Sequence, residues 1–114
     1  MLIPGRFDGK VAVVTGGAKG FGEAIGRRFA AEGAAVMLGD VDEAAGEAVA
    51  AGISASGGRA RFRRCDVAVA ADVEALVAAA VSAHGGLDGM VNNAGFAQAS
   101  MPLWELSEAD FDGQ

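Results

Sequence analysis

A glycine-rich segment, residues 15–22 with the sequence Thr-Gly-Gly-Ala-Lys-Gly-Phe-Gly, directly follows an apolar run. A pyrophosphate requires accessible backbone N–H groups, the positive end of a helix dipole and no Cβ atoms in its way. Gly16, Gly20 and Gly22 meet these needs if a helix begins inside the segment. The alternative is that the glycines only form a tight turn, since the chain has 18 glycines in all. Its position between a predicted strand and a predicted helix favours phosphate binding.

Asp40 is the second candidate binding residue. It lies shortly after the next apolar run, residues 35–38, where the ribose of a bound dinucleotide would be held. A carboxylate at this point can accept hydrogen bonds from both ribose hydroxyls. The alternative is a solvated loop acid beside Asp42 and Glu43, which would be the better interpretation if the glycine segment were absent.

The elements that must position these residues follow from the apolar periodicity. Residues 11–14 and 35–38 are continuous apolar runs, which are typical of strands buried on both faces of a parallel sheet. Between these runs Phe21, Ile25 and Phe29 recur every four residues and predict one buried helical stripe. Gly33 is expected to end this helix in a left-handed conformation.

A second helix and a third strand come next. Asp42 is the predicted N-cap of this helix, and Gly57-Gly58 is its predicted end. The apolar face is expected to comprise Ala45, Val49 and Ile53. Residues 59–63 alternate arginine with apolar residues, a pattern typical of an edge strand that is protected against other chains.

A third helix and a fourth strand complete the pattern. The helix is expected from Asp72 to Gly85-Gly86, and residues 87–91 supply the strand. Its predicted apolar face comprises Val73, Leu76, Val77, Ala80 and Val81. Alternation of strands and helices predicts an α/β fold with a doubly wound, Rossmann-like parallel sheet of strand order 3-2-1-4.

The last residues predict the start of another helix. Ser107 and Asp110 resemble a capping box, and Glu108 adds favourable charge, yet the sequence stops at Gln114. Trp104 and Phe111 are expected to pack together or on a partner subunit. We therefore expect a sheet truncated after about four strands, whose fourth strand is an unprotected edge that favours marginal stability or self-association.

Composition and charge exclude several classes of partner. The net charge of −6 leaves no excess of cationic side chains for the phosphates of DNA or RNA, or for an anionic membrane. Cys65 is the only cysteine, and no CxxC or Cys/His spacing offers metal ligands. No run of apolar residues is long enough for a membrane span or signal peptide. A cytoplasmic location is expected.

Two motifs in the right order resemble the short-chain dehydrogenase/reductase family. The first is the Thr-Gly-x-x-x-Gly-x-Gly spacing of residues 15–22, and the second is Asn92-Asn93-Ala94-Gly95 after the fourth predicted strand. Asp66-Val67 also matches the family's adenine contact after the third strand. The resemblance covers essentially the whole chain and implies that residues 1–114 form an incomplete Rossmann-like NAD-binding domain.

The resemblance assigns roles to individual residues. Gly16, Gly20, Phe21 and Gly22 would lie at the pyrophosphate, and Asp40 at the adenosine ribose. Lys19 is a further predicted cofactor-binding residue. Asp66 and Val67 would flank the adenine. The residues expected to line the cofactor cleft and brace the sheet are Asn92, Ala94 and Gly95. A polar turn that closes a strand is the alternative role of this last group.

NAD is the expected cofactor rather than NADP. An acid at position 40 would face the extra 2′-phosphate of NADP, and like unit charges about 4 Å apart repel by about 4 kcal/mol at an effective dielectric near 20. Lys19 argues in the other direction, because the family often has a basic residue there in members that use NADP. A flexible lysine should not cancel a carboxylate fixed at a strand end.

No catalytic residue is predicted in this chain. The family resemblance implies a Tyr-x-x-x-Lys pair that exchanges a proton with the substrate oxygen, but the chain contains no tyrosine. Lys10 and Lys19, the only lysines, lie in the first strand and the glycine segment. His84 is expected at a helix C-terminus, where a partly charged imidazole meets the dipole, and Cys65 is expected to be a small buried hydrophobe.

The resemblance thus implies an oxidoreductase that interconverts alcohols and carbonyl compounds by hydride transfer, with little activity from this chain alone. A small substrate is expected only for a full-length form, and a homo-oligomer for the intact family member. Two alternatives stay open from the residues. They are a non-catalytic nucleotide-binding or interaction module and a fragment of an S-adenosylmethionine-dependent methyltransferase.

Overall fold

The computed structural model of this protein describes residues 5–92 and 105–106 of the chain. Strands and helices alternate along these residues. Their bounds are β1 (Val11–Thr15), α1 (Gly20–Ala31), β2 (Ala35–Asp40), α2 (Glu43–Ala55), β3 (Arg59–Arg64), α3 (Ala70–His84), β4 (Gly89–Asn92) and β5 (Glu105–Leu106). All strand pairs are parallel, and the order across the sheet is β3-β2-β1-β4-β5. The predicted doubly wound sheet and its order 3-2-1-4 are confirmed.

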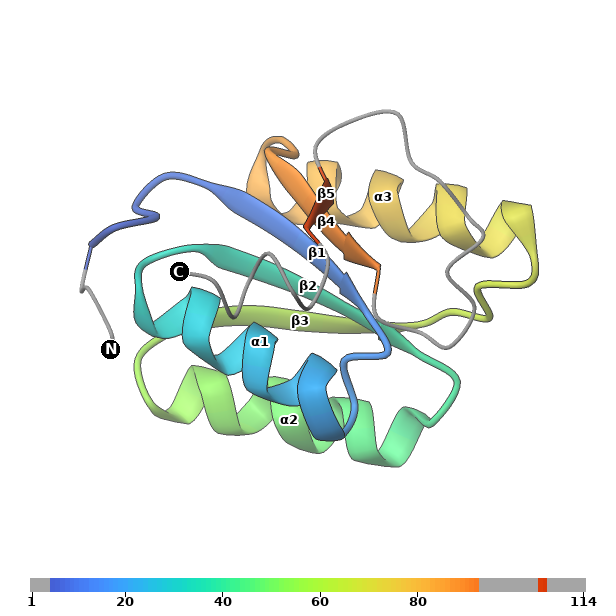
Figure 1. Ribbon diagram of the computed structural model, residues 1–114, viewed down its shortest axis with the longest axis horizontal. Helices are drawn as coiled ribbons and strands as arrows, with labels where there is room; N and C mark the ends of the chain where they lie inside the picture. The colour runs from blue at the N-terminus through green and yellow to red at the C-terminus, as the bar shows by residue number, and fades with distance from the viewer. Residues whose placement is uncertain (1–4, 93–104, 107–114) are drawn as a thin grey trace.

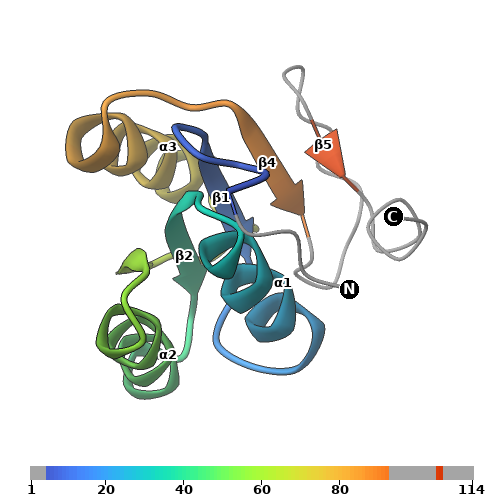
Figure 2. The ribbon, with the colours of Figure 1, turned by 90° about the vertical axis from the view of Figure 1, so that its left-hand side faces the viewer.

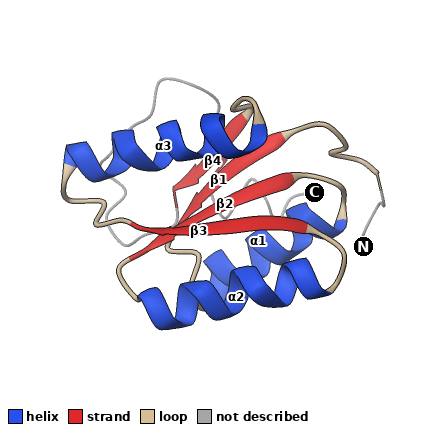
Figure 3. Cartoon of the chain, turned by 180° about the vertical axis from the view of Figure 1, so that it is seen from behind, coloured by secondary structure: helices blue, strands red, loops and turns tan. Residues whose placement is uncertain are grey.

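The sheet is covered on both faces (Figure 1). Helices α1 and α2 lie on one face and α3 lies on the other, as the view from behind also shows (Figure 3). The view turned by 90° shows the same three layers with the strands in the middle (Figure 2). This is the arrangement that right-handed crossovers produce between parallel strands.

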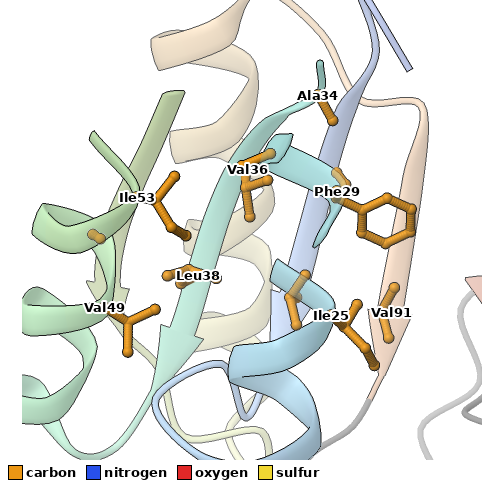
Figure 4. Close-up of a cluster of buried hydrophobic side chains, with 12 residues drawn as sticks. Ile25, Phe29, Ala34, Val36, Leu38, Val49, Ile53 and Val91 are labelled. Carbon is orange, nitrogen blue, oxygen red and sulfur yellow. The ribbon is translucent and has the colours of Figure 1, made fainter. Parts of the chain in front are cut away.

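Burial on both faces explains why the central strands are continuous apolar runs. Side chains alternate along β1, so Ala12 and Val14 face α1 and α2, whereas Val11 and Val13 face α3. The core under α1 and α2 is drawn in Figure 4. Its labelled side chains are Ile25, Phe29, Ala34, Val36, Leu38, Val49, Ile53 and Val91.

Two predicted apolar stripes are narrower than expected. Ile25 and Phe29 are buried in α1, but Phe21 at the start of that helix is 43% exposed. In α3 Leu76 and Ala80 are buried, whereas Val81 is 45% exposed. The prediction that Phe21 and Val81 belong to the core is wrong. Phe21 lies in the first turn of its helix, beyond the residues of α1 that pack on the sheet.

The predicted helix boundaries are partly confirmed. Asp42 is the N-cap of α2, and its side chain accepts a hydrogen bond from the Ala45 N–H. Gly33, Gly57 and Gly85 follow the helices with positive φ, as expected for left-handed caps. The prediction that α3 begins at Asp72 is wrong, since the helix begins at Ala70. Asp72 lies in its first turn and accepts a hydrogen bond from the Asp66 N–H.

One edge of the sheet is as predicted, and the other edge differs from the prediction. Among the described strands β3 is an edge strand, as its alternating arginines predicted. The fourth strand is not an edge, because β5 pairs with it in parallel, Met90 opposite Glu105 and Val91 opposite Leu106. The prediction of an unprotected β4 is therefore wrong. The predicted cap at Ser107 and the packing of Trp104 with Phe111 lie outside the described residues.

None of the helices in the described part of the chain is both long enough and apolar enough to cross a membrane.

Candidate dinucleotide-binding site

The candidate site lies at the carboxyl ends of the central strands. Register places Thr15, the last residue of β1, opposite Gly39 of β2 and Asn92 of β4. Asp40 ends β2 opposite Arg64, the last residue of β3. These strand ends point to the same side of the molecule in Figure 1, where α1 begins. In doubly wound sheets ligands bind at this side of the strands, next to the point where the strand order reverses.

The glycine segment forms a turn, and its glycines are needed for different physical reasons. Gly16 and Gly20 have φ of +67° and +60°, a conformation that L side chains rarely adopt. A Cβ on Gly17 would lie 2.9 Å from Leu38 Cδ2, so this position packs against β2. Among the described residues, a Cβ on Gly20 would meet no atom within 4 Å. Gly20 therefore serves backbone conformation and leaves open space in front of the turn.

Helix α1 begins at Gly20 without a side-chain cap. Its N-cap residue Lys19 is extended and makes no side-chain cap hydrogen bond, whereas the N-cap of α2 is satisfied by the Asp42 carboxylate. Such a start directs backbone N–H groups and the positive end of the helix dipole outward. The exposed Phe21 ring lies in the same turn. This end of α1 is suited to an anion.

Asp40 is fixed by the backbone around it. The N–H of Ala18, inside the glycine turn, donates to Asp40 Oδ2 at 3.0 Å, and the N–H of Asp42 donates to Oδ1 at 3.2 Å. The Asp40 carbonyl oxygen accepts a hydrogen bond of 2.9 Å from the Cys65 N–H. A carboxylate has about four acceptor positions, so each oxygen retains capacity for one more donor. The acid is thus tied to the turn and can still accept from a ligand.

Lys19 and Asp42 form an ion pair beside this acid. Lys19 Nζ lies 3.2 Å from Asp42 Oδ2, and the two side chains are 71% and 37% exposed. The pKa of Asp42 is lowered, first because the Ala45 N–H donates to its carboxylate and then because the Lys19 ammonium does so. Asp42 therefore caps α2 and holds Lys19 at the same time.

The predicted adenine contacts lie at the same end of the sheet, after β3. Asp66 Oδ1 accepts a hydrogen bond of 2.9 Å from the Ala68 N–H and shapes the turn into α3. The Asp66 N–H donates to Asp72 Oδ2 at 3.0 Å, and Arg64 Nη1 lies 3.8 Å from the same oxygen. Val67 is half-buried and packs on the core under α3. Both residues have clear local roles in this turn.

Asn92 is held against β1 by a buried hydroxyl. Thr15 is 1% exposed, and its Oγ1 lies 3.1 Å from Asn92 Oδ1 and 3.4 Å from the Val91 carbonyl oxygen. The hydroxyl can donate its proton to either oxygen, which fixes the end of β4 beside the glycine turn. The predicted site residues Ala94 and Gly95 lie outside the described residues.

Three features of the site were not predicted from the sequence. They are the buried Thr15 hydroxyl that reaches β4, the Ala18 N–H that holds Asp40, and the ion pair of Lys19 with Asp42. The threonine at the end of an apolar strand was a visible sign of the first. The other two join residues far apart in the sequence, and no local pattern indicates them.

His84 and Cys65 are the other titratable residues considered from the sequence. His84 ends α3 as predicted, but its Nε2 lies 3.3 Å from the Val36 carbonyl oxygen. Burial lowers the pKa of His84, which disfavours the expected partly charged imidazole. Cys65 is 2% exposed, and burial raises the pKa of its thiol. The prediction of a small buried hydrophobe is confirmed for Cys65.

A separate apolar cavity of about 330 Å³ lies at the other end of the strands. Its lining includes Phe7, Lys10, Phe29 and Asp88. Lys10 and Asp88 precede β1 and β4, so the cavity opens at the amino ends of these strands, away from the glycine turn. It is not part of the candidate dinucleotide site.

The fold and strand order define a Rossmann-like α/β unit, and comparison with known proteins gives its family. The family model for short chain dehydrogenase matches residues 10–113. The chain therefore belongs to the short-chain dehydrogenase family of oxidoreductases. This membership counts against the methyltransferase alternative.

Individual relatives agree with this assignment. The chain is 50% identical over 115 residues to the sex determination protein tasselseed-2 of Zea mays, and the match covers 96% of this chain and 33% of that protein. It is 50% identical over 100 residues to a 2,5-dichloro-2,5-cyclohexadiene-1,4-diol dehydrogenase of Sphingobium indicum, a match that covers 88% of this chain and 39% of the relative. The chain thus spans well under half the length of these relatives.

A solved structure is similar to this chain in both fold and sequence. The crystal structure of a dehydrogenase/reductase from Sinorhizobium meliloti 1021 superposes with a TM-score of 0.75 at 47% sequence identity. The superposition covers 93% of this chain and 42% of that one.

Proposed function

We propose that this chain binds the adenosine diphosphate half of NAD in an oxidoreductase that interconverts alcohols and carbonyl compounds. The observation that carries the proposal is the 3.0 Å hydrogen bond from the Ala18 N–H to Asp40 Oδ2. It joins the glycine turn, where a pyrophosphate would bind, to the acid that would hold the ribose. The family membership supplies the reaction class.

The described residues fit this ligand. No atom of the described residues lies within 4 Å of a Cβ built on Gly20, and Lys19 places no side-chain cap on the first turn of α1. A pyrophosphate would accept hydrogen bonds from this turn, and the ribose hydroxyls would donate to the remaining acceptor positions of Asp40. We propose contacts at Gly16, Gly20, Phe21 and Gly22 for the pyrophosphate, with Lys19 as a further cofactor-binding residue beside them. The adenine would be flanked by Asp66 and Val67, and the cofactor cleft would be lined by Asn92, Ala94 and Gly95.

We further propose that NAD is preferred over NADP. The Asp40 carboxylate is held by two backbone N–H groups and cannot turn away from an added 2′-phosphate without losing them. Like charges about 4 Å apart repel by about 4 kcal/mol at an effective dielectric near 20, and exposure to solvent reduces this figure. Lys19 opposes the repulsion only partly, since its ammonium is already paired with Asp42.

The nicotinamide of the bound cofactor would supply or accept the hydride. Proton exchange with the substrate needs a positioned acid or base, and the chain contains no tyrosine for that purpose. We therefore propose that the chain by itself binds cofactor with little turnover. The dehydrogenase name of the Sphingobium relative makes cyclic diols the first substrates to test in a protein that joins this chain to the family's catalytic residues. A cytoplasmic location remains a prediction from the sequence.

The variant Phe21→Asp tests the cofactor site without disturbing the core. Phe21 is exposed, and an acid in the first turn of α1 interacts favourably with the helix dipole, so the fold should be retained. The added charge should repel a pyrophosphate and weaken NAD binding at least about tenfold, since about 1.4 kcal/mol of repulsion is sufficient. Isothermal titration calorimetry with NAD measures this.

Phe21→Asn is the matched control, since it removes the same ring without adding charge. We expect it to bind NAD more tightly than the aspartate variant, because it adds no negative charge. The proposal is wrong if the folded wild-type chain shows no NAD binding, or if the aspartate and asparagine variants bind NAD equally well. A non-catalytic nucleotide-binding module would pass this test, but it would show no turnover even with the rest of the family's catalytic residues attached.

A further inference from the structure

Three charged side chains meet where β2 ends and where α1 and α2 begin. Asp40 is the last residue of β2, Asp42 is the N-cap of α2, and Lys19 is the N-cap of α1. Lys19 is the only basic residue of the glycine segment 15–22. The direction in which its ammonium is held therefore affects how the segment receives an anionic ligand.

The two oxygens of Asp42 are used differently. Oδ1 accepts a hydrogen bond of 3.1 Å from the Ala45 N–H, which caps α2, and Oδ2 lies 3.2 Å from Lys19 Nζ. The Asp42 N–H also donates to Asp40 Oδ1 at 3.2 Å. The Asp42 carboxylate is thus held by the first turn of α2, and the Asp42 backbone is held by the proposed ribose acid. A fixed partner holds a flexible lysine better than a mobile one would, because only the lysine loses conformational freedom.

We propose that Asp42 is a specificity-determining residue of the cofactor site, which holds the Lys19 ammonium in an ion pair and so withholds it from the 2′-phosphate of NADP. This inference rests on the proposed function of the site. Without Asp42, Lys19 could reach over a 2′-phosphate and offset the repulsion by Asp40. With Asp42 in place, the site presents two carboxylates and a neutralised lysine, which disfavours NADP more than Asp40 alone would.

The variant Asp42→Asn separates the charge from the cap. Asparagine is as good an N-cap as aspartate, so α2 should keep its start, while the ion pair with Lys19 is lost. We expect the affinity for NADP to rise about fivefold, the upper range for releasing an exposed ion pair. The affinity for NAD should rise less than the affinity for NADP, since NAD carries no 2′-phosphate. Glu43→Gln, an equal change of charge at the next residue, is the matched control and should leave the ratio of the two affinities nearly unchanged.

A double-mutant cycle shows whether Lys19 mediates the effect. Lys19→Met should lower the affinity for NADP more strongly in the Asp42→Asn background than in the wild-type background, because only the first leaves the ammonium available. Equal effects in both backgrounds would mean that Asp42 acts only through its own negative charge, and the inference would be overturned. An unchanged affinity for NADP in Asp42→Asn would also overturn it.

Both dissociation constants are measured by calorimetry on the same folded chain, with circular dichroism to verify the fold of each variant. If Asp42→Asn does not fold, Asp42→Ser keeps a capping hydroxyl and gives the same test. A wild-type chain that binds neither dinucleotide would refute the proposed function together with this inference. A wild-type chain that binds NAD, with no gain for NADP in the variant, would refute the inference alone.

Discussion

Asp40→Asn is a perturbation whose effect can be worked out from the hydrogen bonds of the site. In the wild-type chain Asp40 Oδ2 accepts from the Ala18 N–H and Oδ1 from the Asp42 N–H. Asparagine offers one carbonyl oxygen and one amino group, so it can accept only one of these two bonds. Its amino group would face the other N–H, and two donors would then point at each other.

The size of the effect depends on which bond is lost. Ala18 is 3% exposed, so water cannot readily replace the lost acceptor if its N–H is the one abandoned. A hydrogen bond to a charged group contributes about 1.5–3 kcal/mol, and the half-buried position of Asp40 reduces this toward about 1–2 kcal/mol. For a domain of this size we expect a fall in melting temperature of about 5–10 °C.

Thermal unfolding followed by circular dichroism measures this fall. Glu47→Gln makes the same chemical change on the exposed surface of α2 and should leave the melting temperature within about 1 °C of the wild-type value. The reasoning is refuted if Asp40→Asn melts with the wild-type chain, because the two backbone bonds would then contribute nothing. Below its melting temperature the variant should also show a ratio of NAD affinity to NADP affinity that is at least about tenfold lower than that of the wild-type chain. The reason is that about 1.4 kcal/mol of charge repulsion disappears.

Two further predictions concern the buried hydroxyl of Thr15 and the half-buried imidazole of His84. Thr15→Val removes the hydroxyl that joins β1 to β4 and should lower the free energy of unfolding by about 1 kcal/mol in urea titrations, with an unchanged m-value. An unaltered free energy would mean that the hydroxyl does not stabilise the strand pair. Burial lowers the pKa of His84 in the folded chain from its ordinary value of 6.5. The unfolded chain then binds more protons below this pH, so stability falls as pH decreases from 6.5 toward the folded pKa. Between about pH 7.5 and about pH 5.5 the wild-type chain should lose more stability than His84→Gln, and equal losses would contradict a lowered pKa of His84.

The sequence predicted the order of the elements because each carries a local pattern. Continuous apolar runs at β1 and β2 require burial on both faces of a sheet, and parallel strands joined by right-handed crossovers then leave few possible orders. Asp42 could be recognised as an N-cap for the same local reason. Phe21 was placed in the core because periodicity shows which face of a helix is apolar. Periodicity does not show how far along the helix the packing against the sheet extends.

Some features of the candidate site could likewise be predicted from the sequence, and others were decided by the tertiary structure. The glycine segment and Asp40 could be found from the sequence, since backbone conformation and charge at a strand end are local properties. The role of Asp42 toward Lys19, the tie between Ala18 and Asp40, and the Thr15 hydroxyl against Asn92 were decided by the tertiary structure. These contacts join segments that become neighbours only when β1, β2 and β4 align in register. Short-range patterns hold no information about side chains brought together in this way, because their distances are set by the packing of the whole sheet.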